Sequence, residues 1–199
     1  MRRSTSAILL LAVIAAGVLA AMWQSGGYST RSAPTALERV IVRAARRAAV
    51  PSKARSMGNP VSFSSKVFAE AQAHFADHCA SCHANDGSGL TEIGPNLYPR
   101  APDMRLADTQ NLTDGELYWI IANGVRLTGM PAWGPGGDND ADTWKLVHFI
   151  RRLKDLTPDQ LTAMEALNPK TDAEREEERQ DDQFLSGQDP TPAPPGHQH

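Results

Sequence analysis

The stretch Cys79-Ala80-Ser81-Cys82-His83 decides the fold of this chain. Its two cysteines are the only ones in the 199 residues, so a disulfide framework spanning the fold is excluded. Two cysteines three positions apart lie about one helical turn from each other, so both thiols can face one group. The pattern C-x-x-C-H is typical of covalent haem attachment. We therefore expect one haem c, with its iron, at this site.

Two other kinds of site contain paired cysteines and stay open at this point. A thioredoxin-like redox pair requires a βαβ context, and no segment of this sequence alternates convincingly as a strand. A zinc site is the stronger competitor, because nitrogen and sulfur ligands lie close together in the sequence: His74, His78, Cys79, Cys82 and His83. Haem is favoured because a domain with few strands and a long loop needs a large apolar group at its centre.

Composition divides the chain into four predicted segments: 1–23, 24–61, 62–156 and 157–199. The first segment contains Arg2 and Arg3 and then an uncharged, largely apolar run from Ala7 to Trp23, which is typical of a signal peptide or a membrane anchor. The run lacks a strong cleavage site, so we favour the anchor. Such an anchor places the remaining chain in the periplasm, on the outer side of a bacterial inner membrane. The periplasm is also expected if the signal is cleaved.

The second segment is predicted to be a basic linker, with seven basic residues and the single acid Glu38 between Arg31 and Arg55. Within it, Leu37 to Ala48 has apolar residues at helical spacing, and this helix either lies on anionic lipid or is solvated. No nucleic-acid motif accompanies these charges, so no nucleic-acid partner is expected. The last segment is predicted to be a short helix over Pro158 to Leu167 followed by an acidic, proline-rich disordered tail.

Residues 62–156 have the composition of a folded domain, and local signals predict three principal helices. Thr113 and Glu116 have the spacing of a capping box. Residues 84–111 are rich in Gly, Pro, Asn and Asp, which predicts a loop with at most a turn or two of helix. The helices are expected between these residues: Ser64 or Ser65 to Cys79, Thr113 to Gly124, and Asp140 to Leu153.

At these residues the sequence resembles a class I cytochrome c domain. Ala71 and Phe75 lie at the small and aromatic positions that precede the haem cysteines in that family and pack against its last helix. Gly94-Pro95-Asn96-Leu97 resembles the loop beneath the proximal face of the haem. Gly129-Met130-Pro131-Ala132-Trp133 resembles the loop that delivers the distal methionine. One departure is Ala84, which follows the histidine where the family often has glycine.

The resemblance implies an all-α, small cytochrome c fold of three main helices and loops around one covalent haem. By the same resemblance, Cys79 and Cys82 would attach the haem, and His83 would be the proximal ligand of its iron. Met130 would be the distal ligand. The carbonyl of Pro95 would accept the N–H of the proximal imidazole, which fixes the ring.

The function implied by the resemblance is electron transfer rather than catalysis, with iron cycling between ferric and ferrous. Histidine and methionine would occupy both axial positions and leave no open site for a reactant. The expected partners are redox proteins that donate and accept electrons, and the membrane through the N-terminal helix. Two alternatives stay open: the chain is the cytochrome subunit of a larger membrane-bound dehydrogenase or oxidase, or it is a haem-based gas sensor.

Overall fold

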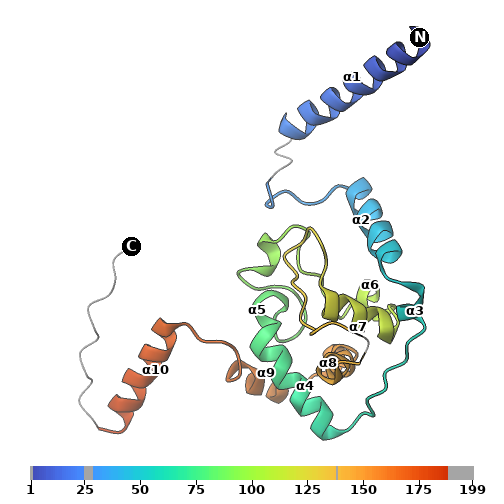
Figure 1. Cartoon of the computed structure of the whole chain (residues 1–199). Coiled ribbons are helices and arrows are strands. Elements are labelled where there is room, and N and C mark those ends of the chain that lie inside the picture. The colour runs from blue at the N-terminus through green and yellow to red at the C-terminus, as the bar shows by residue number, and fades with distance from the viewer. Residues whose placement is uncertain (1, 25–28, 138, 188–199) are drawn as a thin grey trace.

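The structure is a computed structural model, and it describes residues 2–24, 29–137 and 139–187. Within these ranges every regular element is a helix and no strand occurs, so the all-α prediction is confirmed (Figure 1). Two crossing helices lie at the centre of the domain: α4 (Ser65–His78) and α8 (Ala141–Ile150).

Both crossing helices begin where the sequence predicts. The side chain of Ser64 accepts a hydrogen bond from the amide of Val67, and the side chain of Asp140 caps α8 in the same way. Phe75 and Phe149 pack together between the helices, with ring centroids 4.8 Å apart, and both are almost fully buried. Ala71 is also buried in this core. The expected contact between the first and last helices of the domain is therefore present.

The third main helix, α7 (Asp114–Asn123), fixes the start of α8. Its capping box between Thr113 and Glu116 is formed as predicted. The ring of Tyr118 stacks on Trp144 with centroids 4.2 Å apart. The Tyr118 hydroxyl also donates to the carbonyl of Gly137 and accepts from the amide of Asp140. The residues just before α8 are therefore held on α7.

The connections between these helices contain only short elements. They are α5 (Ala80–His83), η1 (Gly94–Asn96), α6 (Ala107–Gln110) and η2 (Leu153–Asp155). The prediction that 84–111 is mainly loop is confirmed. After η2, α9 (Pro158–Glu165) lies against α4, where Met164 is fully buried and Gln72 donates to the carbonyl of Gln160. The short helix predicted in this segment is therefore part of the domain.

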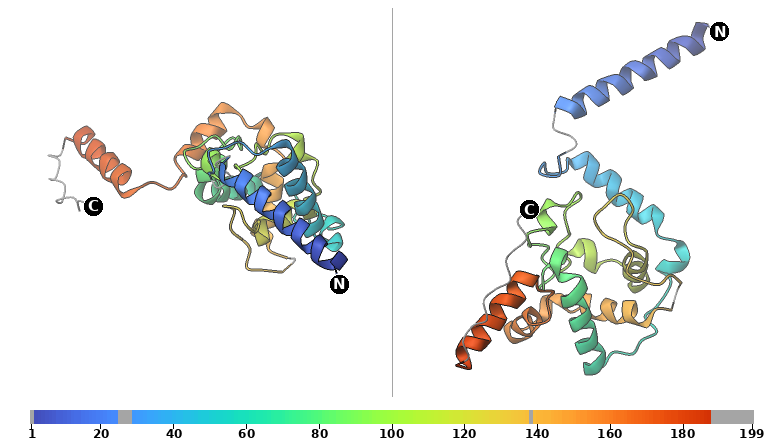
Figure 2. Two further views of the ribbon diagram at one scale, coloured as in Figure 1. Left: turned by 90° about the horizontal axis from the view of Figure 1, so that it is seen from above. Right: turned by 60° about the vertical axis from the view of Figure 1, so that its left-hand side comes forward.

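Three helices precede the domain: α1 (Arg2–Gln24), α2 (Ala36–Ala49) and α3 (Ser52–Arg55). Helix α1 points away from the domain, and α2 lies between α1 and the domain (Figure 2). Among the residues that the structure describes, no helix meets the length and hydropathy needed to cross a membrane.

The end of the predicted linker packs on the domain. Ala54 in α3 is buried, and a Cβ atom added at Gly115 would lie only 1.8 Å from the Ala54 carbonyl oxygen. Gly115 is the second residue of α7, so only glycine allows α3 to approach this closely. Helix α3 therefore covers the start of α7, a contact that the sequence pattern did not indicate.

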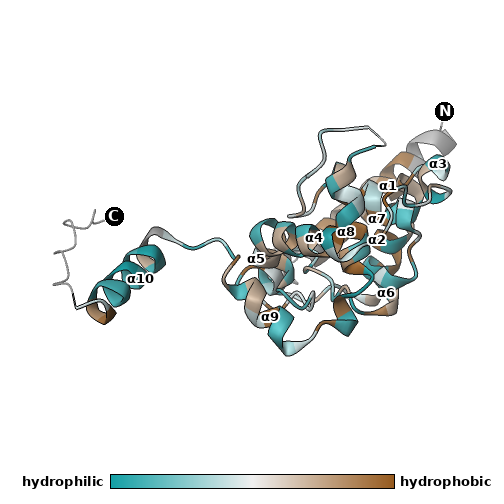
Figure 3. Cartoon of the chain, turned by 90° about the horizontal axis from the view of Figure 1, so that it is seen from below, coloured by the Kyte–Doolittle hydropathy of each residue, from teal (hydrophilic) through white to brown (hydrophobic). Residues whose placement is uncertain are grey.

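The prediction of a disordered tail is wrong for residues 172–185, which form α10 (Asp172–Leu185). The helix starts with a capping box between Thr171 and Glu174, and an ion pair joins Glu176 to Arg179 one turn apart. It projects away from the domain and is hydrophilic except near its end (Figure 3). The proline-rich part of the predicted tail, 188–199, lies outside the described residues.

Candidate functional site

The C-x-x-C-H stretch lies where α4 ends and α5 begins. Cys79 is the C-cap of α4, and its carbonyl accepts hydrogen bonds from the amides of Cys82 and His83 at 3.2 and 2.9 Å. Both thiols are free. One tight turn therefore carries two thiols and an imidazole.

The protein uses only part of the hydrogen-bonding capacity of the His83 imidazole. Its Nδ1 atom is buried and has no hydrogen-bond partner. Burial lowers the pKa of His83, and the carbonyl of Pro102 offsets part of that shift. The ring is therefore neutral near pH 7, which is the form that binds iron. The hydrogen bond from this ring to Pro95 stays a prediction.

The two alternatives to haem lose support at this turn. Burial, together with the neighbouring Cys82 thiol, raises the pKa of Cys79 to about 12. A redox-active pair requires the opposite, a thiol whose pKa is lowered. Within the described ranges, no group of three or more His, Cys, Asp or Glu side chains is placed to hold a metal ion. The five potential zinc ligands therefore do not converge.

A loop held by Thr91 packs directly beneath this turn. The Thr91 hydroxyl accepts from the amide of Gly94 at 2.8 Å and donates to the carbonyl of Cys82 at 3.5 Å. A Cβ atom at Gly94 would lie 2.4 Å from the Cys82 oxygen and 2.3 Å from the Gly89 oxygen. Only glycine therefore fits here, and it brings Pro95 close to the motif. Sequence reasoning missed Thr91, although a threonine three residues before glycine is a common turn signal.

Met130 lies in a second loop whose backbone is well fixed. Its amide donates to the Thr128 hydroxyl and its carbonyl accepts from the amide of Val125. The turn starts at Gly124, which has φ of +65° and no room for a side chain beside Pro131. The Met130 side chain is half-buried and packs against the core.

Two contacts join the Met130 loop to the segments around the cysteines. A Cβ atom at Gly129 would lie 2.6 Å from the side chain of Leu97, which follows η1. The ring of Trp133 contacts His78, the residue before Cys79, with centroids 5.4 Å apart. The structure therefore places the Met130 loop against the chain on both sides of the C-x-x-C-H turn.

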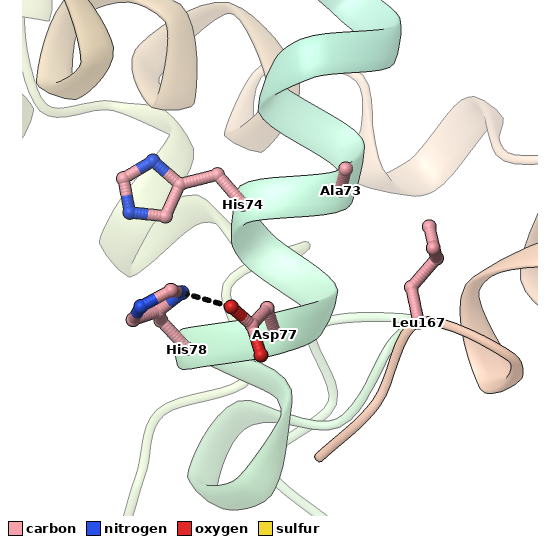
Figure 4. A pocket seen from close by; sticks show the side chains of 5 residues that line it. All are labelled: Ala73, His74, Asp77, His78 and Leu167. Carbon is pink, nitrogen blue, oxygen red and sulfur yellow. Dashed lines mark ion pairs between the residues drawn. The ribbon is translucent and has the colours of Figure 1, made fainter.

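Three further histidines lie on the two crossing helices. His74 and His78 project from the same side of α4, with ring centroids 4.9 Å apart (Figure 4). They line a shallow pocket of about 420 Å³ together with Ala73, Asp77 and Leu167. His148 contacts the carbonyl of Val61 at 2.7 Å and so joins α8 to the segment before α4.

Comparison with protein families adds an independent finding. Residues 67–150 match the family described as cytochrome c oxidase, cbb3-type, subunit III. The match includes the C-x-x-C-H turn, the Gly94 loop and the Met130 loop. A comparison with curated proteins found no match.

The matched part of the chain is a c-type cytochrome domain, consistent with the class I monohaem type. A domain of this class carries covalently bound haem c and transfers electrons rather than catalysing a reaction. The residues present fit the group, because two free thiols and a buried imidazole nitrogen without a partner leave the same turn. When bound, haem c supplies an iron that takes up and releases one electron.

Proposed function

We propose that this protein is a membrane-anchored monohaem electron carrier in which Cys79 and Cys82 hold the haem. In this proposal His83 is the proximal iron ligand and Met130 the distal one. The observation that carries the proposal is the buried Nδ1 atom of His83, which has no hydrogen-bond partner and lies beside two free thiols. An imidazole in this setting gains an interaction when it binds iron, whereas a ring that only packs in a core is normally hydrogen-bonded.

The chain's own residues provide for a stable ligand set. The α5 backbone fixes the direction of His83, and Pro95 lies in the loop packed on the same turn. The Met130 loop is tied to α7 through the amides of Trp133 and Gly134, which donate to carbonyls of that helix. Thioether ligation favours reduced iron and raises the reduction potential. This arrangement would suit a carrier, because His83 and Met130 would both hold the iron and leave no open site for a reactant.

The choice of Met130 is tested against Met104, the other methionine between the cysteines and α8. Met104 is buried in the core, and its amide donates to the carbonyl of Gly87. We expect Met130→Ala to lose the weak thioether-to-iron band at the red end of the oxidised spectrum and to lower the potential. The same variant should bind carbon monoxide when reduced. Met104→Ala should lower the stability of the fold and keep the band.

Each alternative outcome has a definite meaning. If Met130→Ala retains the band and Met104→Ala loses it, Met104 is the ligand and the proposed ligand set is refuted. If the unmodified reduced protein already binds carbon monoxide at neutral pH, the distal ligand is labile and a gas sensor replaces the carrier. Haem staining after denaturing electrophoresis tests covalent attachment, because a haem that is not covalently bound is lost from the band.

We also propose that α1 anchors the protein in a bacterial inner membrane, with the haem domain in the periplasm. The support is the uncharged run from Ala7 to Trp23 and its many exposed apolar side chains, among them Leu9, Leu11 and Val13. Membrane fractionation with amino-terminal sequencing tests this. A soluble mature protein that begins near Ala21 would refute the anchor and leave export to the periplasm intact.

A second role, as the cytochrome subunit of a larger membrane-bound dehydrogenase or oxidase, is favoured by the family match. The matched family is described as a subunit of a cytochrome c oxidase. In such an assembly the chain would deliver electrons without holding the active site. Purification from membranes in mild detergent tests this role. A larger subunit that co-purifies in a fixed ratio supports it, and a haem protein that purifies alone supports the independent carrier.

A further inference from the structure

Helix α2 has two sides of different character. At 100° per residue, its arginines lie within one arc of about 100°: Arg39, Arg43, Arg46 and Arg47. Three of its four larger apolar residues, with two alanines, lie within another arc of about 100°: Leu37, Val40, Ile41, Ala44 and Ala48. The fourth, Val42, lies beside the arginines. This pattern is typical of a helix that buries one of its two sides.

The contacts of α2 show which side faces the domain. Arg43 forms an ion pair with Asp108 in α6. Glu38 accepts a hydrogen bond from the hydroxyl of Tyr98 at 2.9 Å. Arg46 is half-buried, and its Nε atom is enclosed. The loop from Tyr98 to Asp108 therefore lies against the arginine side of the helix.

The apolar side consequently faces away from the domain. Leu37, Val40 and Ile41 are 69%, 64% and 56% exposed, and no residue of α2 is buried. An outward stripe of large apolar residues on a well-capped helix is unusual for a free surface. It indicates that another apolar surface covers α2 in the assembled protein.

We propose that α2 lies in the interfacial layer of an anionic bilayer, with Leu37, Val40 and Ile41 inserted among the lipid chains. This inference rests in part on the proposed anchor, because only eleven residues separate α1 from α2, so α2 would lie near the same bilayer. Arg47 borders the apolar arc and can reach an anionic headgroup while its stem stays in the interface. Through Arg43 and Glu38, the helix would then orient the domain on the membrane.

The main alternative to a lipid surface over α2 is helix α10 of a second copy of the chain. Its charge makes it a candidate. Its acidic residues complement the arginines of α2, but Arg43 and Arg46 already face the domain. Its exposed large apolar residues, Phe184 and Leu185, both lie at its end and do not match a stripe of three turns. A lipid surface covers the whole stripe, so we favour it.

The test is hydrogen–deuterium exchange of the full-length holoprotein in lipid nanodiscs. One set contains phosphatidylcholine alone, and the other contains equal parts of phosphatidylcholine and phosphatidylglycerol. We expect the α2 amides to exchange about tenfold more slowly in the anionic discs, since basic residues near an anionic surface strengthen interfacial binding. The double variant Leu37→Ser/Ile41→Ser should lose this protection. The control Phe184→Ser/Leu185→Ser, also exposed, should keep it.

The outcomes separate this inference from the proposed function. All variants retain α1 and the haem site. An unchanged haem spectrum therefore verifies the fold in the samples in which the exchange of the α2 amides is measured. The inference is overturned if the unmodified protein exchanges equally in both lipids, or if the Leu37→Ser/Ile41→Ser variant is protected in anionic discs as strongly as the unmodified protein. Protection that rises with protein concentration overturns it in favour of a second copy. If α1 is cleaved in the cell, flotation of the mature holoprotein with vesicles of the same two compositions replaces the disc experiment, with the same expected loss in the double variant.

Discussion

Replacing Ala84 with glycine should stabilise this domain, although glycine usually destabilises a folded chain. Ala84 follows His83 and closes α5 with φ of 60° and ψ of 157°. This backbone region is essentially restricted to glycine, because the Cβ atom of any other residue crowds the neighbouring backbone. Its amide still donates to the carbonyl of Ala80 at 2.8 Å, so the turn is held in spite of the strain.

The expected gain follows from two opposing effects. Strain in this region costs about 1–3 kcal/mol for a residue with a Cβ atom. Glycine gives the unfolded chain more freedom, which costs roughly 0.5–1 kcal/mol. The Ala84→Gly variant should therefore be more stable by about 1 kcal/mol.

The assay is guanidinium unfolding of the oxidised holoprotein, followed by circular dichroism. Ala69→Gly is the matched control. Ala69 is exposed in the middle of α4, so this substitution makes the same chemical change in ordinary helical backbone. We expect Ala69→Gly to lose about 1 kcal/mol, so the two variants should move in opposite directions. A loss of stability in Ala84→Gly similar to that of the control would refute the reasoning.

Three further predictions concern packing, hydrogen bonding and pH. Gly94→Ala should cost about 3 kcal/mol, because its Cβ atom would meet two backbone oxygens that cannot rotate away, whereas Gly58→Ala, with open space around it, should change the unfolding midpoint little. Arg151→Met should cost about 2–3 kcal/mol in the same assay, because the guanidinium pairs with Asp114 and donates to the carbonyls of Gln110 and Leu112. Burial and the neighbouring His78 lower the pKa of His74 from its ordinary value of 6.5, so the unfolded chain binds more protons and stability should fall as the pH drops through 6.5. His74→Gln should reduce this loss in urea titrations at a series of pH values.

Local sequence signals predicted the elements of this domain well. Ser64 and Thr113 each cap a helix as expected, because capping depends on residues within one turn. Helix α10 was missed for a related reason. Its composition suggested a solvated chain, and the capping box at Thr171 was not weighed against that composition.

Contacts between distant segments were not predictable in the same way. The approach of Ala54 to Gly115 and of Gly129 to Leu97 depends on small residues meeting across the fold. Nothing in the periodicity of either segment encodes its partner. At the site, the residue types followed from spacing and resemblance, whereas the enclosed ring of His83 and the anchoring role of Thr91 required three-dimensional structure.

Because α4 and α8 cross, the order in which the helices of the domain pack and the haem attaches is important. The two helices are separated by residues 79–140, so their contact closes a long loop and raises the contact order of the domain. The thiols at Cys79 and Cys82 leave the site of synthesis or export well before α8 does. Once α8 has docked, Cys79 is packed against the core that both helices form. A chain that closes its core early would hide this thiol, so we expect covalent attachment to proceed on the open chain and the last helix to complete the domain afterwards.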